Sequence, residues 1–120
     1  ECPLPIIAAR SPSDCFEIAI DAWRIAAKYM TPVMILSDGY IANGSEPWKI
    51  VDFNSFEKIK IEHPTGPNDG DKFLPYLRNE NLARPWAIPG TPGLMHRVGG
   101  LEKQDGTGNV SYDPVNHHNM

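Results

Sequence analysis

The apolar residues in the first third of the chain form three consecutive patterns. Residues 4–9 are a short apolar run predicted to be a strand, and Pro3 before it and Pro5 within it confine its early part to a sheet edge or to the start of the strand. Residues 33–36 form an uninterrupted apolar run, as expected of a parallel strand buried on both faces. A helix is predicted between them, from about Ser11 to about Met30. The three elements together predict one β-α-β unit of an α/β fold.

The predicted helix separates its charged residues from its apolar residues. Four charged residues recur at spacings of four, three and four, which places them along one stripe with acids before bases, as the helix dipole favours. They are Glu17, Asp21, Arg24 and Lys28. The rest of the circumference is apolar or small, which indicates cover by protein on more than one side. Because one sheet face cannot cover that surface, the chain alone is expected to oligomerise.

The composition changes after residue 43. Eight of the twelve prolines and nine of the ten glycines lie there, and most of this sequence has the composition of turns. Only residues 56–62, with Ile59 and Ile61 on one side, and residues 94–98 have weak strand patterns. We therefore expect a long irregular segment. Such a segment indicates a piece of a larger protein, as does a start without Met.

Charge and composition argue against several classes of function. Eleven Lys and Arg against fifteen Asp and Glu give a net charge of -4, and no basic stripe is present, so a nucleic-acid partner is not expected. No run approaches the roughly 20 apolar residues that cross a bilayer, and the first residues do not form a signal peptide. Two cysteines, Cys2 and Cys15, are too few for a disulfide framework. These observations predict a cytoplasmic protein that binds neither nucleic acid nor membrane.

Three residues are candidates for contact with a substrate or with a partner subunit. Asp38 and Tyr40 follow the buried strand directly, at the end where open α/β sheets bind ligands. The alternative is that Asp38 ends the strand while Gly39 supplies an unusual backbone angle. Arg97 lies beside paired glycines and could receive a carboxylate, or it could form an internal or intersubunit salt bridge.

The remaining notable side chains predict structural roles. The four histidines lack the spacing that aims two imidazoles at one metal, so no metal site is expected. Trp48 and Trp86 each lie near a proline in loop-like surroundings and are expected to anchor the irregular segment on another surface.

Five long phrases of the sequence resemble one enzyme family. They are residues 11–16, 32–48, 81–93, 96–103 and 105–114. In them the chain closely resembles the alpha subunits of 2-oxoglutarate:ferredoxin oxidoreductases, of the 2-oxoacid:acceptor oxidoreductase family. The resemblance covers nearly the whole chain and does not fix the choice among 2-oxoacids.

The resemblance implies an internal fragment of such a subunit. Residues 1–43 would be the C-terminal part of the pyrimidine-binding domain, and residues 44–120 the connection toward a domain like the C-terminal domain of transketolase. The whole enzyme would use thiamine diphosphate, magnesium and an iron–sulfur cluster, with a beta subunit, ferredoxin and coenzyme A as partners. It would decarboxylate a 2-oxoacid oxidatively to an acyl-coenzyme A.

The fragment itself is expected to lack the catalytic and cofactor-binding residues. The family's characteristic motifs for these groups are absent from this sequence, so no catalytic residue is carried over. We expect the chain alone to be inactive and to bind neither thiamine diphosphate nor a metal. Two alternatives remain, an assembly segment that docks the partner subunit through its Trp48 and Trp86 loops, and a small free-standing α/β binding module.

Overall fold

The computed structural model describes residues 3–97 and 99–120. The chain divides into two compact units, Glu1–Ile61 and Glu62–Met120, and each is described by itself. The division between residues 61 and 62 separates two compact parts of this chain. The domain boundary that the sequence analysis expects after residue 43 is a different boundary and stays a prediction.

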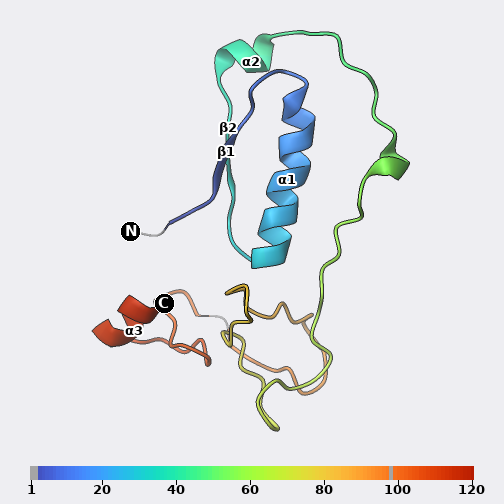
Figure 1. Ribbon diagram of the computed structural model, residues 1–120. Helices are drawn as coiled ribbons and strands as arrows, with labels where there is room; N and C mark the ends of the chain where they lie inside the picture. The colour runs from blue at the N-terminus through green and yellow to red at the C-terminus, as the bar shows by residue number, and fades with distance from the viewer. Residues whose placement is uncertain (1–2, 98) are drawn as a thin grey trace. The chain divides into compact units, whose positions relative to one another are not determined.

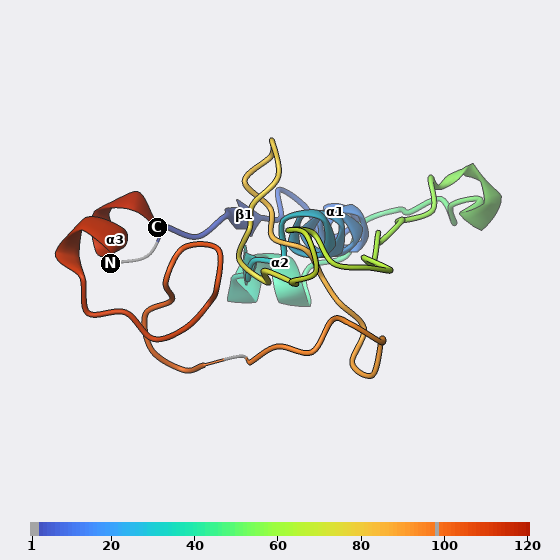
Figure 2. The ribbon, with the colours of Figure 1, turned by 90° about the horizontal axis from the view of Figure 1, so that it is seen from below.

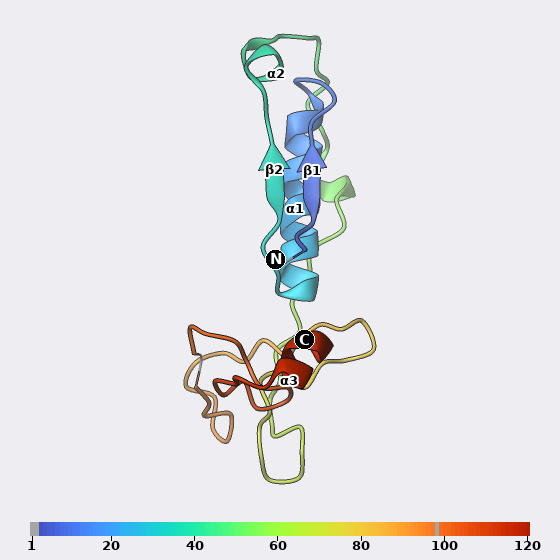
Figure 3. The ribbon, with the colours of Figure 1, turned by 90° about the vertical axis from the view of Figure 1, so that its left-hand side faces the viewer.

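The first unit contains the predicted β-α-β arrangement. Strand β1 (Ile6–Ala8) and strand β2 (Met34–Leu36) pair in parallel, with Ile6 opposite Met34. Helix α1 (Asp14–Tyr29) connects them and lies against the strand pair, which Figure 3 shows side by side in front of the helix. The α/β class is confirmed, and both strands are shorter than the apolar runs that predicted them.

Helix α1 begins three residues later than the sequence pattern predicts. Residues 11–13 form a turn instead, in which the Ser11 hydroxyl accepts a hydrogen bond from the Asp14 N–H at 3.4 Å. The helix ends at Tyr29, and the next residue, Met30, has a φ of 50° in the left-handed region that terminates many helices. Acidic residues occupy its first turn and Lys28 its last, as the helix dipole favours.

An aromatic cluster provides the second cover that the apolar helix requires. After the short helix α2 (Gly39–Asn43), the chain returns past α1 through the 3₁₀-helix η1 (Phe53–Ser55), as Figure 1 shows. The Phe16 ring of α1 meets three rings of this segment at centroid distances of 5.4, 5.9 and 6.3 Å. They belong to Trp48, Phe56 and Phe53 respectively. The cover is incomplete, because Trp23, two turns further along α1 than Phe16, is 60% exposed.

The second unit is built mostly from turns. A small core contains the buried side chains of Phe73, Ala83 and Leu94. Isolated antiparallel bridges, among them Tyr76 with Gly106, connect the loops around it. Figure 2 shows the loop that leads into the terminal helix α3 (Pro114–Asn119). The predicted Pro/Gly-rich irregular segment is thus present, with local order that its composition did not reveal.

Two predicted strands are wrong. Residues 56–61 have no regular structure, and Phe56 packs on Phe16 instead of belonging to a sheet. Residues 94–97 are also irregular, and Val98 lies outside the described residues. An alternating pattern needs a partner strand to form a ladder, and the described part of the chain pairs neither segment with one. Within the same residues, no helix is long and apolar enough to cross a bilayer.

Candidate functional site

Asp38 has a structural role at the end of β2. Its carboxylate accepts hydrogen bonds from the backbone N–H groups of Tyr40, at 2.8 Å, and Ile41, at 2.9 Å. These are two of the donors that the first turn of α2 leaves without a helical partner. The sequence left two interpretations of Asp38 open, a ligand contact and a residue that ends the strand. The geometry supports the second, because Asp38 follows β2 and its carboxylate caps α2.

Tyr40 is held by this turn and directs its ring to solvent. Its side chain is 90% exposed, while α2 is fixed at both ends. The Asn43 side chain donates to the Gly39 carbonyl at 2.7 Å, and the Gly44 N–H donates to the Ile41 carbonyl at 3.2 Å. Tyr40 is thus a large apolar group on a well-ordered turn, which suits a contact outside this chain.

Removing the Asp38 carboxylate should destabilise the turn. We expect Asp38→Ala to lower the free energy of unfolding by about 1 kcal/mol, the usual cost of losing a helix N-cap. Asp38→Asn keeps an oxygen acceptor and should retain most of that stability. Urea denaturation of both variants measures the difference, and equal stability of Asp38→Ala and the parent protein would contradict the capping role.

The N-terminus of α1 is occupied by a carboxylate from a distant loop. Glu46 Oε1 accepts a hydrogen bond from the Ser13 backbone N–H at 2.6 Å. Hydrogen bonds from the side chain and backbone of Ser13, and then from the side chain of Ser11, lower the pKa of Glu46 below its ordinary value of 4.5. Glu46 therefore joins the segment after α2 to the start of α1.

The lowered pKa of Glu46 gives its contact a defined pH dependence. Because the folded state favours the charged carboxylate, the stabilisation is present above pH 4.5 and is lost as the pH falls through the lower folded value. Glu46→Gln should reduce the acid sensitivity of unfolding below pH 4.5. Glu57→Gln, at an exposed glutamate of the same unit, makes the same change of charge and is the matched control, and an equal effect of the two substitutions would contradict the role of the Ser13 contact.

The two loop tryptophans pack within their own units. Trp48 lies on Phe16, and Trp86 lies edge-on to His63 at a centroid distance of 6.3 Å. His63 Nδ1 also forms a hydrogen bond of 2.6 Å with the Trp86 carbonyl. Trp48 therefore anchors the irregular segment on α1, as predicted, whereas Trp86 contacts another residue of the irregular segment itself.

Arg97 is exposed in the second unit. Within residues 3–97 and 99–120 it makes no hydrogen bond and no ion pair. The internal salt bridge, one of the alternatives for this residue, is therefore not formed in the described part of the chain. Its guanidinium remains available for a substrate or subunit contact. Asp38 and Tyr40 lie close together at the start of α2 in the first unit, whereas Arg97 belongs to the second unit.

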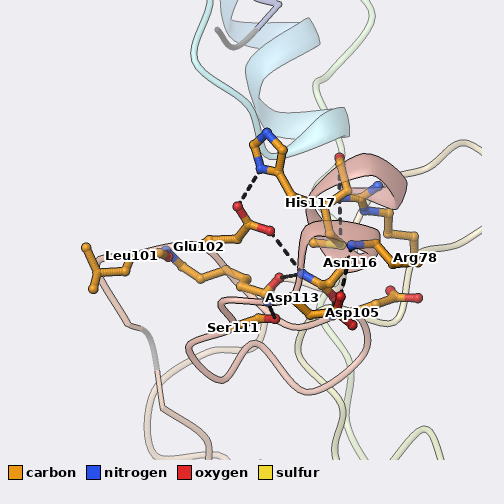
Figure 4. Close-up of polar contacts among 11 residues, drawn as sticks. Arg78, Leu101, Glu102, Asp105, Ser111, Asp113, Asn116 and His117 are labelled. Carbon is orange, nitrogen blue, oxygen red and sulfur yellow. Dashed lines mark hydrogen bonds and ion pairs between the residues drawn. The ribbon is translucent and has the colours of Figure 1, made fainter.

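A polar network in the second unit connects α3 to the preceding loop (Figure 4). Glu102 Oε2 lies 2.5 Å from His117 Nδ1, and Asn116 donates to the other Glu102 oxygen at 3.2 Å. Asn116 also donates to the Lys103 carbonyl at 2.8 Å and accepts from the Asp105 N–H at 2.9 Å. These contacts hold a six-residue helix that is too short to be stable by itself.

The network borders a shallow hollow of about 410 Å³ whose lining is mainly apolar. Ser111 also lines the hollow, but its Oγ accepts from the Asp113 N–H at 3.2 Å and makes no bond with His117 in the described structure. The His117 side chain is 75% exposed, and ion pairs in such positions contribute at most about 1 kcal/mol. The geometry therefore supports a structural role for this network, in which Glu102 and the Lys103 carbonyl hold α3 in place.

The sequence analysis missed this network and the helix it holds. A local signal for the helix was present, because Asp113 precedes Pro114 and both favour a helix start. The Asp113 carboxylate indeed accepts from the Val115 N–H at 2.9 Å. No comparable signal joined Glu102 to His117, since they are fifteen positions apart and outside any regular repeat.

The described residues do not fit a magnesium–diphosphate group by themselves. Among residues 3–97 and 99–120, no three His, Cys, Asp or Glu side chains are grouped to hold a metal ion. The N-terminus of the longest helix, the natural place for a diphosphate, already carries the carboxylates of Glu46 and Asp14.

Comparison with known proteins identifies a family and several relatives. The family model described as "Pyruvate flavodoxin/ferredoxin oxidoreductase, thiamine diP-bdg" matches residues 1–112. The chain is 56% identical over 121 residues to the 2-oxoglutarate oxidoreductase subunit KorA of Mycobacterium tuberculosis, covering 100% of this chain and 18% of that protein. No solved structure gives a significant match.

Two further relatives are less similar. The 2-oxoglutarate synthase subunit KorA of Methanothermobacter thermautotrophicus is 29% identical, over 95% of this chain and 30% of its own length. The 2-oxoacid:ferredoxin oxidoreductase 1 subunit alpha of Aeropyrum pernix is 30% identical, over 97% of this chain and 18% of its own length. The chain thus spans less than a third of each relative.

Proposed function

Because this chain belongs to the thiamine-diphosphate-binding family of pyruvate flavodoxin/ferredoxin oxidoreductases, we propose that it is a segment of the alpha subunit of a 2-oxoacid oxidoreductase. The substrate that we propose is 2-oxoglutarate. The observation that carries this choice is 56% identity, along the whole chain, to a subunit named for that substrate. The short match relative to the length of each relative supports a segment over a free-standing module.

In the proposed reaction the 2-oxoacid loses its carboxyl group as CO2, the remaining acyl group is oxidised and forms a thioester with coenzyme A, and the two electrons released pass to ferredoxin. The whole enzyme would hold thiamine diphosphate, magnesium and an iron–sulfur cluster, assemble with a beta subunit, and work in the cytoplasm. The cofactor supplies the chemistry and the protein orients it. We assign this chain a scaffold role, in which the β-α-β unit contributes to a larger sheet and the second unit supplies ordered surface loops.

The proposal is tested with the intact protein purified together with its partner subunit. We expect reduction of ferredoxin to depend on both 2-oxoglutarate and coenzyme A, with lower kcat/KM for pyruvate. Preference for pyruvate would overturn the choice of substrate. Absence of coenzyme-A-dependent ferredoxin reduction with every 2-oxoacid tested would overturn the oxidoreductase proposal.

Arg97 is the cation that we propose to act at the substrate or at the subunit interface. Arg97→Ala should remove a charge-assisted contact and weaken binding roughly ten- to a hundredfold. A substrate role raises the KM for the 2-oxoacid with normal assembly, whereas an interface role weakens association of the subunits. Arg97→Lys keeps the charge and serves as the control. Unchanged KM, turnover and assembly in Arg97→Ala would assign Arg97 to the ordinary exposed surface.

The second candidate function is an assembly segment. Trp48 and Trp86 support it less than expected, because both rings pack within their own units. The exposed ring of Tyr40 is the observation that favours it. Tyr40→Ala should then weaken subunit association without changing the KM for the 2-oxoacid, whereas a substrate role for Tyr40 would change the KM in the assembled enzyme.

A further inference from the structure

The sequence contains a single Asn-Gly pair, Asn43 followed by Gly44. Such a pair is chemically reactive, because the backbone nitrogen of the second residue can attack the side-chain amide carbon of the asparagine, and glycine has no side chain to hinder the attack. Asn43 is the last residue of α2, and Gly44 is its C-cap. The reactive pair therefore lies where α2 passes into the segment that returns past α1.

Close packing favours glycine at position 44. A Cβ atom there would lie 3.0 Å from the Tyr40 carbonyl oxygen and 3.1 Å from Cγ of Pro12. The Tyr40 carbonyl belongs to the backbone of α2, and the Pro12 ring is rigid, so neither neighbour withdraws easily. The contact between the end of α2 and the turn before α1 thus depends on a residue that also makes Asn43 reactive.

The folded turn occupies both reacting groups. The Asn43 side-chain amide donates to the Gly39 carbonyl at 2.7 Å, and the Gly44 N–H donates to the Ile41 carbonyl at 3.2 Å. The nitrogen that would attack is therefore already a hydrogen-bond donor, and the amide group that would be lost is held against the first residue of α2. Both hydrogen bonds have to break before the two groups can meet, so the reaction requires α2 to open.

We propose that Asn43 is a site of spontaneous deamidation that the folding of α2 controls. The Gly44 nitrogen forms a bond to Cγ of Asn43, the bond between Cγ and Nδ2 breaks, and the side-chain nitrogen leaves as ammonia with the proton of the Gly44 N–H. Water then adds to either carbonyl of the resulting succinimide ring and opens it to aspartate or isoaspartate. Water is the co-reactant, and the proposal does not depend on the proposed function.

The product would destabilise the turn that controls the reaction. A carboxylate at position 43 has no hydrogen to donate to the Gly39 carbonyl, so two acceptors would replace the hydrogen bond of 2.7 Å. Isoaspartate would also add a methylene group to the backbone beside Gly44, where Tyr40 and Pro12 already leave little space. A molecule that has reacted therefore keeps a less stable α2.

The test measures deamidation of the intact protein at neutral pH by peptide mass spectrometry, in native buffer and in urea. We expect the native protein to react about tenfold more slowly or less, because α2 protects Asn43. Opening of a single turn is fast compared with deamidation, so the rate follows the fraction of molecules in which α2 is open. Asp38→Ala removes the N-cap of α2 and should raise the native rate about fivefold, with no change in urea.

Asp52→Ala is the matched control. Asp52 accepts the same kind of hydrogen bond, from the Asn54 N–H at 2.9 Å, but it begins η1 instead of α2. Its substitution should leave the rate at Asn43 unchanged. An equal increase in both variants would overturn the proposal, because the reaction would then follow unfolding of the whole unit.

Two further results would overturn the proposal. Equal rates in the native and the urea-unfolded parent protein would show that α2 does not protect Asn43, and this comparison needs no variant. Equal native rates in Asp38→Ala and the parent protein would show that the capped turn does not control the reaction.

Discussion

Gly108→Ala is expected to destabilise the second unit by about 2–4 kcal/mol, since it combines backbone strain with overpacking. Gly108 has a φ of +70°, and a Cβ atom there would lie 2.4 Å from Cδ2 of Tyr76. The Tyr76 ring has little freedom to withdraw. The Arg84 guanidinium lies over it at 4.7 Å from the ring centroid, and the Tyr76 N–H donates to the Gly106 carbonyl at 2.9 Å.

Two other glycines of this unit separate the two causes. Gly70 has a φ of +58°, but a Cβ there would meet no described atom within 4 Å, so Gly70→Ala should show the backbone cost alone, about 1–2 kcal/mol. Gly100 has neither feature and should tolerate alanine with little change. Hydrogen exchange of the Tyr76 amide in the intact protein measures the effect. Equal protection in Gly108→Ala and Gly70→Ala would contradict the predicted clash with Tyr76.

Phe16→Ala is expected to lower the stability of the first unit by about 2–4 kcal/mol. Its ring is the common member of all three contacts in the aromatic cluster, so its loss leaves Trp48, Phe53 and Phe56 without their central partner. Because these rings cover one side of α1, the segment after α2 should detach more readily. A red shift of the Trp48 fluorescence would report this.

Phe53→Ala is the matched control for Phe16→Ala. Phe53 is 67% exposed and has only an edge contact to Phe16 among the described rings, so its truncation should cost less than about 1 kcal/mol. Equal losses for the two variants would show that the cluster is not centred on Phe16.

The sequence predicted those parts of the fold whose patterns are local. Charge placement and apolar content located α1, and the apolar runs located β1 and β2, which form one β-α-β unit. The same content predicted a second cover for α1, yet the residues that provide it come from 32 to 40 positions further along. Nothing local links Phe16 to Trp48. The alternating residues Ile59 and Ile61 led to a wrong strand prediction. Their local pattern is that of a strand, but a strand forms only where a partner strand is available.

Aspartate residues explain much of the order that the sequence analysis did not predict. Asp38, Asp52 and Asp113 each accept a hydrogen bond from the N–H two positions later and begin α2, η1 and α3. Asp38 was interpreted as a strand end or a ligand contact, and the capping role lies closer to the first. Whether Tyr40 and Arg97 contact a substrate or a partner depends on protein surfaces outside this chain, which no pattern within it records.

The parallel pairing of β1 with β2 also bears on how the first unit folds. Ile6 pairs with Met34, so the chain must close a loop of 27 intervening residues before this pairing forms. The backbone hydrogen bonds of helix α1 are local, so the helix can form within about a microsecond, whereas the strand pairing and the Phe16 cluster need distant segments. We expect α1 to act as an early template. Substitutions that lower its helix propensity should then slow folding, and substitutions at Trp48 or Phe56 should mainly accelerate unfolding in stopped-flow experiments.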